Sequence, residues 1–403
     1  MQNISQGYMN SGKYIFAQVV EFLPDRIFDT IVKHHQGDFH AKRLNSYNHL
    51  LHLVFGQLTA CTSLRDICLC LNAYPKRLFH LGFRQTVNES SLSRANDNRD
   101  YRIFEQLGYT MIDIVRPKYQ QARVKGIYLP DYELFALDST SISVSIKLAN
   151  WALGKYSKGA VKMHAQIDLR GSIPTFIYIT DGKWHDSNVL NIMEFSANAI
   201  YTMDKAYVDF DALRRIDDCG SYFVTRAKSA MRYEIIESNY NINGAIGLQG
   251  DHTIRLTGYK TSKLYPKHLR LVQFHDIESD ENLEFITNLT TSLEISALQI
   301  ANIYRNRWQI EVFFKWLKQN LTIKYLWGYS ENAVRIHLWT AIITYLLVAR
   351  IKAELDSPYS ITEVATLLCV SAMEKIPLRY LLSKTNYELD SKQNVNERDL
   401  ILF

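Results

Sequence analysis

The sequence has few cysteines, and their spacing suggests no framework. They are odd in number and form no CxxC pair: Cys61, Cys68, Cys70, Cys219 and Cys369. This argues against a disulfide scaffold and a structural zinc site. A histidine-based zinc site is equally unexpected, because neither His164 nor His185 has a second His or Cys at ligand spacing. We interpret the cysteines as reduced thiols in the core.

Long apolar runs and targeting signals are also missing. The longest apolar run, 338–349, lies between His337 and Arg350 and is too short to cross a bilayer, so it predicts a buried helix. The N-terminus shows no charged head followed by an apolar stretch and a cleavage site. We therefore expect a cytoplasmic protein without a membrane span.

What the chain does have is length, apolar residues and an uneven distribution of charge. Its 403 residues are 47% hydrophobic, enough for a large core and more than one structural unit. The net charge is +5, while residues 1–130 hold sixteen Lys and Arg against ten Asp and Glu. A basic N-terminal part suits a polyanion such as DNA, although a plain solvated surface would give similar counts.

Residues 1–126 are predicted to form a helical N-terminal domain that binds DNA. Apolar residues recur there at spacings of three and four, as in 50–58 and 104–114. The segment 88–102 has Ser90 and Ser91 as candidate N-caps and then presents Arg94, Asn96, Asn98, Arg99 and Arg102. Arg and Asn read base edges and phosphates, so this is either a recognition helix or simply an exposed polar helix.

The pattern changes to strands after residue 127. The expected order is three strands, a helix, a strand, a helix and a strand, at 133–138, 161–168, 173–180, 188–195, 199–204, 207–216 and 222–226. This order indicates an α/β fold with a ribonuclease-H-like mixed sheet. We assign 127–228 and 289–354 to this catalytic core. A β-rich insertion, 229–288, interrupts it, with alternating runs at 253–257, 269–274 and 283–286; a helical segment with a polar tail, 355–403, follows it.

Two long helices are expected near the end of the core, at 297–320 and 331–354. Ser296 and Gln299 form a capping box, and Ile295 and Ile300 can form a hydrophobic staple. At 100° per residue, one face of the first helix collects Tyr304, Arg307, Glu311, Lys315 and Lys318. Periodicity alone does not distinguish this stripe from an ordinary solvated face.

Four of these residues stand as Y-(2)-R-(3)-E-(6)-K within YRNRWQIEVFFKWLK. This motif resembles the YREK signature of DDE transposases of the IS-four insertion-sequence family. LDSTSI around Asp138 resembles the first acid of that family, and YTMDKAYVD around Asp204 resembles the second. The resemblance spans about residues 130–350 and extends more weakly over the helical N-terminus.

The resemblance implies a metal-dependent enzyme. Asp138, Asp204 and Glu311 would hold two Mg²⁺ ions, which Mn²⁺ can replace, and these ions activate one oxygen and stabilise another. Arg307 and Lys318 would hold phosphates, with Tyr304 beside them and Lys315 on the same DNA-facing stripe. The partners would be double-stranded DNA, namely the terminal inverted repeats and the target, and a second copy of the chain in a synaptic dimer.

The implied reaction is hydrolysis that frees a 3′-OH at each transposon end, followed by attack of that hydroxyl on target DNA. Family members commonly pass through a DNA hairpin with a flipped base stacked on an aromatic. Here no tryptophan occurs between Trp184 and Trp308, so Tyr259, Tyr265 or Phe285 would have to serve. Lys205 also stands where an arginine often follows the second acid in the family.

Three alternatives remain open from the sequence. The chain could be a ribonuclease-H-like nuclease without strand transfer, or an inactive transposase-derived DNA-binding protein. Asp186 could contact a metal from outside the three acids or could simply be a helix N-cap.

Overall fold

The computed structural model describes residues 12–383, except 40, 42, 145–150, 153, 155–158, 240–246, 278–279 and 291–294. The polar tail predicted from Ser383 therefore lies almost entirely outside the described residues. The chain divides into two compact units, one formed by residues 1–118 and 315–403 and the other by residues 119–314. Each unit is described separately below.

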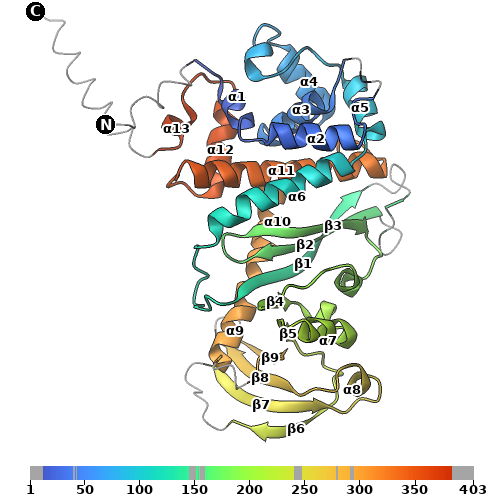
Figure 1. The fold of residues 1–403 in the computed structure, drawn as a ribbon, viewed down its shortest axis with the longest axis vertical. Helices are drawn as coiled ribbons and strands as arrows, with labels where there is room; N and C mark the ends of the chain where they lie inside the picture. The colour runs from blue at the N-terminus through green and yellow to red at the C-terminus, as the bar shows by residue number, and fades with distance from the viewer. Residues whose placement is uncertain are drawn as a thin grey trace, which may run out of the picture. The chain divides into compact units, whose positions relative to one another are not determined.

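The second unit is built on a nine-stranded mixed sheet with the order β3-β2-β1-β4-β5-β9-β8-β7-β6 (Figure 1). The first five strands in chain order are β1 (Glu133–Val144), β2 (Gly159–Asp168), β3 (Ile173–Asp181), β4 (Ala199–Met203) and β5 (Tyr222–Arg226). β1, β2 and β3 form an antiparallel meander, and β4 and β5 run parallel to β1. This is the ribonuclease-H-like arrangement, so the predicted fold class is confirmed.

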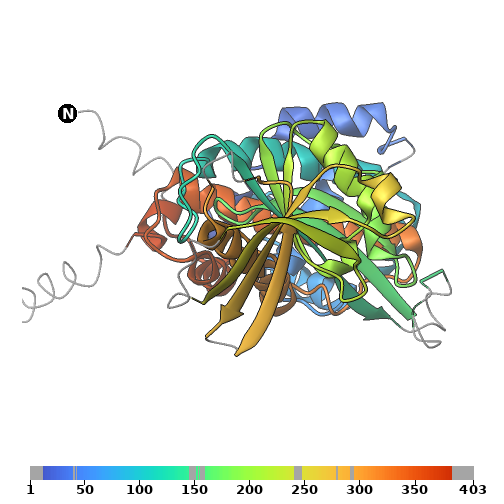
Figure 2. The ribbon, with the colours of Figure 1, turned by 90° about the horizontal axis from the view of Figure 1, so that it is seen from below.

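The insertion extends the same sheet. Its strands are β6 (Tyr233–Ser238), β7 (Leu248–Leu256), β8 (Leu269–Asp276) and β9 (Glu281–Thr287). β9 joins the core by pairing antiparallel with β5. Sequence alternation located β7, β8 and β9 but missed β6, whose middle residues are exposed on both faces and so do not alternate. The sheet twists strongly, and its strands fan out across one another in Figure 2.

Alternate residues of β1 face opposite layers. Phe135 and Leu137 belong to a hydrophobic core that also contains residues of η4 (Asp186–Asn191), η5 (Lys205–Tyr207) and α7 (Phe210–Asp218). The other face is covered by α9 (Ala297–Asn306), which contacts β4, β5, β7 and β8 and continues into α10 (Trp308–Asn320). Asp138, between Leu137 and Ser139, therefore points to the α9/α10 side. A short helix, α8 (Thr261–Leu264), precedes β8.

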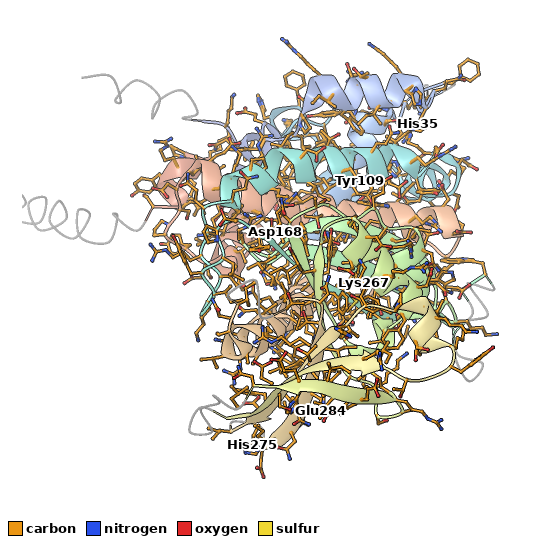
Figure 3. All side chains as sticks on the ribbon, turned by 60° about the horizontal axis from the view of Figure 1, so that its bottom comes forward. His35, Tyr109, Asp168, Lys267, His275 and Glu284 are labelled. Atoms are coloured by element: carbon orange, nitrogen blue, oxygen red, sulfur yellow. The ribbon has the colours of Figure 1, made fainter. Side chains whose placement is uncertain are left out.

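The hairpin between β2 and β3 requires a glycine. Gly171 has φ +89°, and a Cβ at that position would collide with the ring of Tyr119. Asp168 ends β2 with 1% of its surface exposed and accepts hydrogen bonds from Arg170, which fixes the entry to the turn (Figure 3). The connection between the strands predicted at 161–168 and 173–180 is thus a tight, hydrogen-bonded turn.

The first unit is helical. Its α-helices are α1 (Ile15–Val20), α2 (Asp25–His34), α3 (Ser46–Leu58), α4 (Leu64–Asn72), α5 (Glu89–Asn98), α6 (Arg102–Val115), α11 (Glu331–Glu354), α12 (Ile361–Ser371) and α13 (Leu378–Leu381). Two 3₁₀ turns accompany them, η1 (Phe79–Leu81) and η2 (Arg116–Tyr119), the second ending at the boundary of the two units. The cysteines are free, as expected, but Cys70 and Cys219 are exposed rather than in the core.

Helix α11 is the centre of the helical unit. By length and composition it could cross a membrane, but 89% of its most apolar window is buried inside the structure. It packs against α3, α5, α6 and α12, running beside α6 in Figure 1. The sequence assigned 331–354 to the catalytic core, whereas the structure groups it with the N-terminal helices. An apolar surface on all sides identifies a buried helix but does not say which elements cover it.

Three local predictions need correction. The N-cap of α5 is Asn88, which accepts a hydrogen bond from the Ser91 N–H, so neither Ser90 nor Ser91 caps it. The helix predicted at 188–195 is only the 3₁₀ turn η4, capped by His185. The single helix predicted at 297–320 is interrupted at Arg307, where Ile310 N–H bonds to the Arg307 carbonyl in a tight i+3 turn.

Candidate active site

The register of three parallel strands brings charged residues to one edge of the sheet. Leu137 of β1 is paired with Met203 of β4, and Met203 is paired with Thr225 of β5. The next residue on each strand is charged: Asp138, Asp204 and Arg226. These three residues therefore lie side by side where the parallel pairing ends. The sequence placed Asp138 at the end of its strand, at 133–138. The structure continues β1 to Val144, and Asp138 lies at the point where β1 loses its β4 neighbour.

Helices α9 and α10 supply the third acid. The predicted capping box at Ser296 and Gln299 is present in full, and both residues of the staple, Ile295 and Ile300, are buried. Because the helix starts at a defined residue, the cap determines which of its polar side chains face the sheet. Glu311 follows the break at Arg307, in the first turn of α10.

Arg307 lies between two of the acids. Its Nη1 donates to Asp138 Oδ2 at 3.1 Å, and its Nη2 donates to Glu311 Oε1 at 2.7 Å. Its guanidinium carbon is 5.5 Å from the centre of the Tyr304 ring. Burial lowers the pKa of Arg307, but Tyr304, Glu311 and Asp138 raise it, and the net shift is upward. The arginine is thus a permanent cation held against two partly exposed carboxylates.

Asp138 is a partly buried carboxylate with a raised pKa. Burial raises its pKa from 3.8 to about 6; the Ser139 N–H and Arg307 oppose this rise, and the nearby Glu311 and Asp204 add to it. The backbone N–H of Ser139 donates to Asp138 Oδ1 at 2.8 Å. Asp204 caps η5 by accepting the Ala206 N–H at 3.0 Å. A desolvated acid beside two others is stabilised by nearby positive charge, and Arg307 supplies only part of that charge.

A cavity of about 340 Å³ opens beside this cluster. Its wall includes Asp204, Arg226, Phe285, Tyr304, Arg307 and Trp308. Tyr304 is 8% exposed and packs on Phe285 with ring centres 4.7 Å apart, so both rings belong to the wall. Trp308 is 60% exposed and is available for stacking.

The aromatics proposed from the sequence are less suited to stacking than Trp308. Tyr265 is buried and donates a hydrogen bond to Asp217, and Phe285 is buried beneath Tyr304. Tyr259 is 82% exposed and pairs with Lys263. Trp308 was missed because a replacement for the stacking tryptophan was expected within the insertion. Trp308 lies outside it, directly after the motif arginine.

Arg226 was missed for another reason. It lies next to Asp204 in the register, lines the same cavity, and is 3.8 Å from Glu281. The signal was present, because the three strand-like stretches ELFALD, AIYTMD and YFVTR all end in a charged residue. Reading that signal requires the strands to be known as neighbours.

Lys318 of the signature and Lys315 of the same predicted face lie further along α10, on residues that group with the helical unit. Lys315 is exposed. Lys318 is half-buried, and burial, followed by Lys324, lowers its pKa.

In the predicted recognition helix, only some of the Arg and Asn side chains are exposed. Arg94 and Asn98 are exposed and border a cavity of about 330 Å³ together with Phe39. Arg99 is 9% exposed and donates to the carbonyls of Gly37 and Leu44, so it holds its own unit together. Asn96 is buried against His49, and Arg102 pairs with Asp100.

Asp186 caps no helix, which overturns the simpler of its two sequence interpretations. Its Oδ1 accepts the Ser139 hydroxyl at 2.7 Å and lies 3.1 Å from Lys162 Nζ. The N-cap of η4 is His185, one residue earlier.

The fold and the placement of the acids define a ribonuclease-H-like enzyme that acts on nucleic acid. The family model described as "Transposase DDE domain" matches residues 129–347, and the chain belongs to this family of DNA-cleaving and DNA-joining enzymes. The expected resemblance is therefore confirmed. Residues 11–84 match a second model, described as "Domain of unknown function (DUF4372)".

Curated relatives agree with this assignment. The chain is 32% identical over 270 residues to "Putative transposase y4zB" of Sinorhizobium fredii, covering 66% of this chain and 71% of that protein. It is 31% identical over 274 residues to "Putative transposase for insertion sequence element IS4SA" of Synechocystis, covering 66% and 72%. Among solved structures, the piggyBac transposase synaptic complex with hairpin DNA aligns with a TM-score of 0.46 and 10% identity, covering 98% of this chain and 86% of that one.

Proposed function

We propose that this transposase cleaves the ends of its insertion sequence and joins the freed 3′-OH to target DNA, using two divalent ions held by Asp138, Asp204 and Glu311. The observation that carries the proposal is the convergence of Asp138, Asp204 and Glu311 at one edge of the sheet, where burial and the two neighbouring acids raise the pKa of Asp138 to about 6. Such a cluster stabilises added cations. Mg²⁺ is the ion we expect, with Mn²⁺ as a substitute, since all donors are carboxylate oxygens.

The residues fit the ions chemically, but one side chain has to move. Among the residues that the structure describes, no three His, Cys, Asp or Glu side chains are grouped closely enough to hold a metal as they stand. Arg307 occupies the space between Asp138 and Glu311. Its guanidinium engages one oxygen of each carboxylate, so it must leave a carboxylate before both oxygens of that group can bind ions. When bound, the ions would activate the attacking oxygen and stabilise the leaving oxygen.

The chain's own side chains have separate tasks in this proposal. Arg307, released from the acids, would grip a phosphate in a bidentate manner. Tyr304 is too buried to bind DNA broadly, and its ring supports the guanidinium instead. Arg226 would hold a second phosphate at the cavity. Lys318 remains a candidate phosphate contact from the resemblance, and Lys315 remains a candidate DNA contact from its place on the same predicted helical face.

Trp308 is our candidate for stacking an unpaired base. Its ring is exposed at the cavity that Asp204 lines, and base–aromatic stacking tolerates any sequence. If a hairpin intermediate forms, this ring replaces the tryptophan that the insertion lacks. The prediction is specific to position 308, because Tyr265 and Phe285 are covered and Tyr259, although exposed, does not line this cavity.

We also propose that the helical N-terminal part binds the terminal repeats, with Arg94 and Asn98 as contacts, that two copies act together on paired ends, and that the protein works in the cytoplasm on nucleoid DNA. Arg99 is not part of this proposal, since its donors are used within the protein.

The test is an end-cleavage and strand-transfer assay with purified protein and a labelled duplex from one end of its own insertion sequence. Wild type should produce both cleaved ends and joined products in Mg²⁺. Asp138→Ala and Glu311→Ala should still bind the duplex but lose both products. Cleavage without joining would favour a nuclease. Binding without either product would favour an inactive DNA-binding protein.

A further inference from the structure

A buried polar cluster lies behind Asp138, on the opposite face of the sheet. Ser139 follows Asp138 on β1, so its side chain points to the η4 side. His164 is paired with Ser139 in the register and is fully buried, and Lys162, two residues earlier on β2, shares its face. Asp186, at the start of η4, reaches this group from the segment after β3.

Asp186 is the centre of this cluster. Its Oδ1 accepts the Ser139 hydroxyl at 2.7 Å, lies 3.1 Å from Lys162 Nζ and lies 3.8 Å from His164 Nδ1. Lys162 is 7% exposed and also donates to the Trp184 carbonyl at 2.9 Å. One carboxylate therefore ties β1, β2 and the segment after β3 together, and it neutralises a buried lysine.

The position of this tie on β1 is informative. Pairing of β1 with β4 stops at Leu137 and Met203, so beyond that point β1 is held on one side only, by β2. Asp138 is the first residue without a β4 partner. Ser139 has two contacts that relate to it: its N–H donates to Asp138 Oδ1, and its hydroxyl donates to Asp186. Asp186 thus restrains the residue that orients the catalytic carboxylate.

We infer that Asp186 is a positioning residue for Asp138, acting through the Ser139 hydroxyl rather than as a metal ligand. The inference rests on the proposed role of Asp138 in cleavage. The Asp186 oxygen that is engaged lies with Ser139, Lys162 and His164 on the face away from Glu311 and Arg307. Displacing a reacting group by about 1 Å can slow a reaction about 100-fold.

The experiment compares Ser139→Ala, Asp186→Ala and the double variant in single-turnover end cleavage at saturating protein. Each single variant should cleave about 100-fold more slowly than wild type with unchanged affinity for the duplex. The double variant should be no slower than Asp186→Ala, because both changes break one connection and their effects should not add. Ser141→Ala is the matched control: this exposed residue lies two positions further on the same strand face and should cleave at the wild-type rate.

Removing Asp186 alone leaves Lys162 buried without its carboxylate, so that variant can fail to fold. The pair Asp186→Ala with Lys162→Met removes both charges and should fold, as judged by its melting profile, while cleaving as slowly as Ser139→Ala. A wild-type rate for Ser139→Ala would overturn the inference, whatever Asp186→Ala does. Multiplying losses in the Ser139/Asp186 double variant would also overturn it. If wild type itself cleaves nothing, the proposed function fails instead.

Discussion

Replacing Asp138 with Asn should stabilise the metal-free protein while abolishing cleavage. The carboxylate is buried beside Asp204 and Glu311, and its pKa is raised from 3.8 to about 6. At 1.36 kcal/mol for each pKa unit, the ionised group costs the folded state about 3 kcal/mol. Asn has nearly the same size and retains an oxygen that can accept from Arg307. It therefore removes the charge without opening a cavity.

The sign of the pH dependence follows from the raised pKa. Above about pH 6 the folded carboxylate is ionised and the full penalty is present; below 3.8 the group is protonated in both states and the penalty is absent. Wild type should thus gain stability from this group as the pH falls from 6 to 4. Asp138→Asn lacks this penalty. Its free energy of unfolding should therefore exceed that of wild type by about 3 kcal/mol at pH 8, and the difference should vanish near pH 4.

The assay is thermal melting in EDTA across this pH range. For a unit the size of residues 119–314, 3 kcal/mol corresponds to a rise in Tm of roughly 6 to 12 °C at pH 8. Asp131→Asn, at an exposed carboxylate, controls for the loss of one negative charge and should melt like wild type. The reasoning is refuted if Asp138→Asn melts at or below the wild-type temperature at pH 8, or if its advantage does not change with pH.

Three further predictions concern individual residues. Trp308→Ala should weaken productive binding of a transposon end about 5- to 100-fold in a cleavage titration, with Trp308→Phe largely restoring it and Tm unchanged; equal rates for all three proteins would exclude a stacking role. Arg99→Ala should lower stability by about 1–3 kcal/mol in urea denaturation, because two carbonyls lose their donor, whereas Arg94→Ala should reduce DNA affinity without changing stability. Gly171→Ala should cost about 1–3 kcal/mol, because the left-handed φ and the Tyr119 ring both oppose a Cβ; an unchanged urea midpoint would contradict this.

Local patterns explain what could be predicted from the sequence. Alternation located the strands of the core, and Ser296 with Gln299 located the start of α9 to the residue, because a capping box involves only four consecutive positions. The acids were found through short motifs that surround each of them. All of these signals depend on neighbours in the chain.

The remaining features depend on contacts between distant segments. Arg226 is next to Asp204 only through the β4–β5 register, and Asp186 meets Ser139 across 47 positions of sequence. The apolar, mostly buried α11 gave no sign of which helices would cover it. The break at Arg307 contains neither Gly nor Pro, so propensity gave no warning of it, although Tyr304, Arg307 and Glu311 still lie together across the break.

The break at Arg307 also has a consequence for how metal and DNA bind. In the structure the Arg307 guanidinium donates from Nη1 to Asp138 and from Nη2 to Glu311, so a phosphate gripped by these two nitrogens competes with the acids. A phosphate that draws Arg307 away leaves two acids uncompensated and raises their affinity for a cation. By linkage, a bound cation must raise the affinity for that phosphate equally.

Mn²⁺ should therefore bind more tightly when a transposon-end duplex is present, measured with Asp204→Asn to prevent cleavage. In Arg307→Gln the metal affinity should be higher without DNA and should respond little to the duplex. If the duplex changes Mn²⁺ affinity equally in both proteins, the coupling does not run through Arg307. Such coupling would keep the metal-dependent chemistry low until a DNA end is in place, because the arginine that holds the end is the one that otherwise occupies the acids.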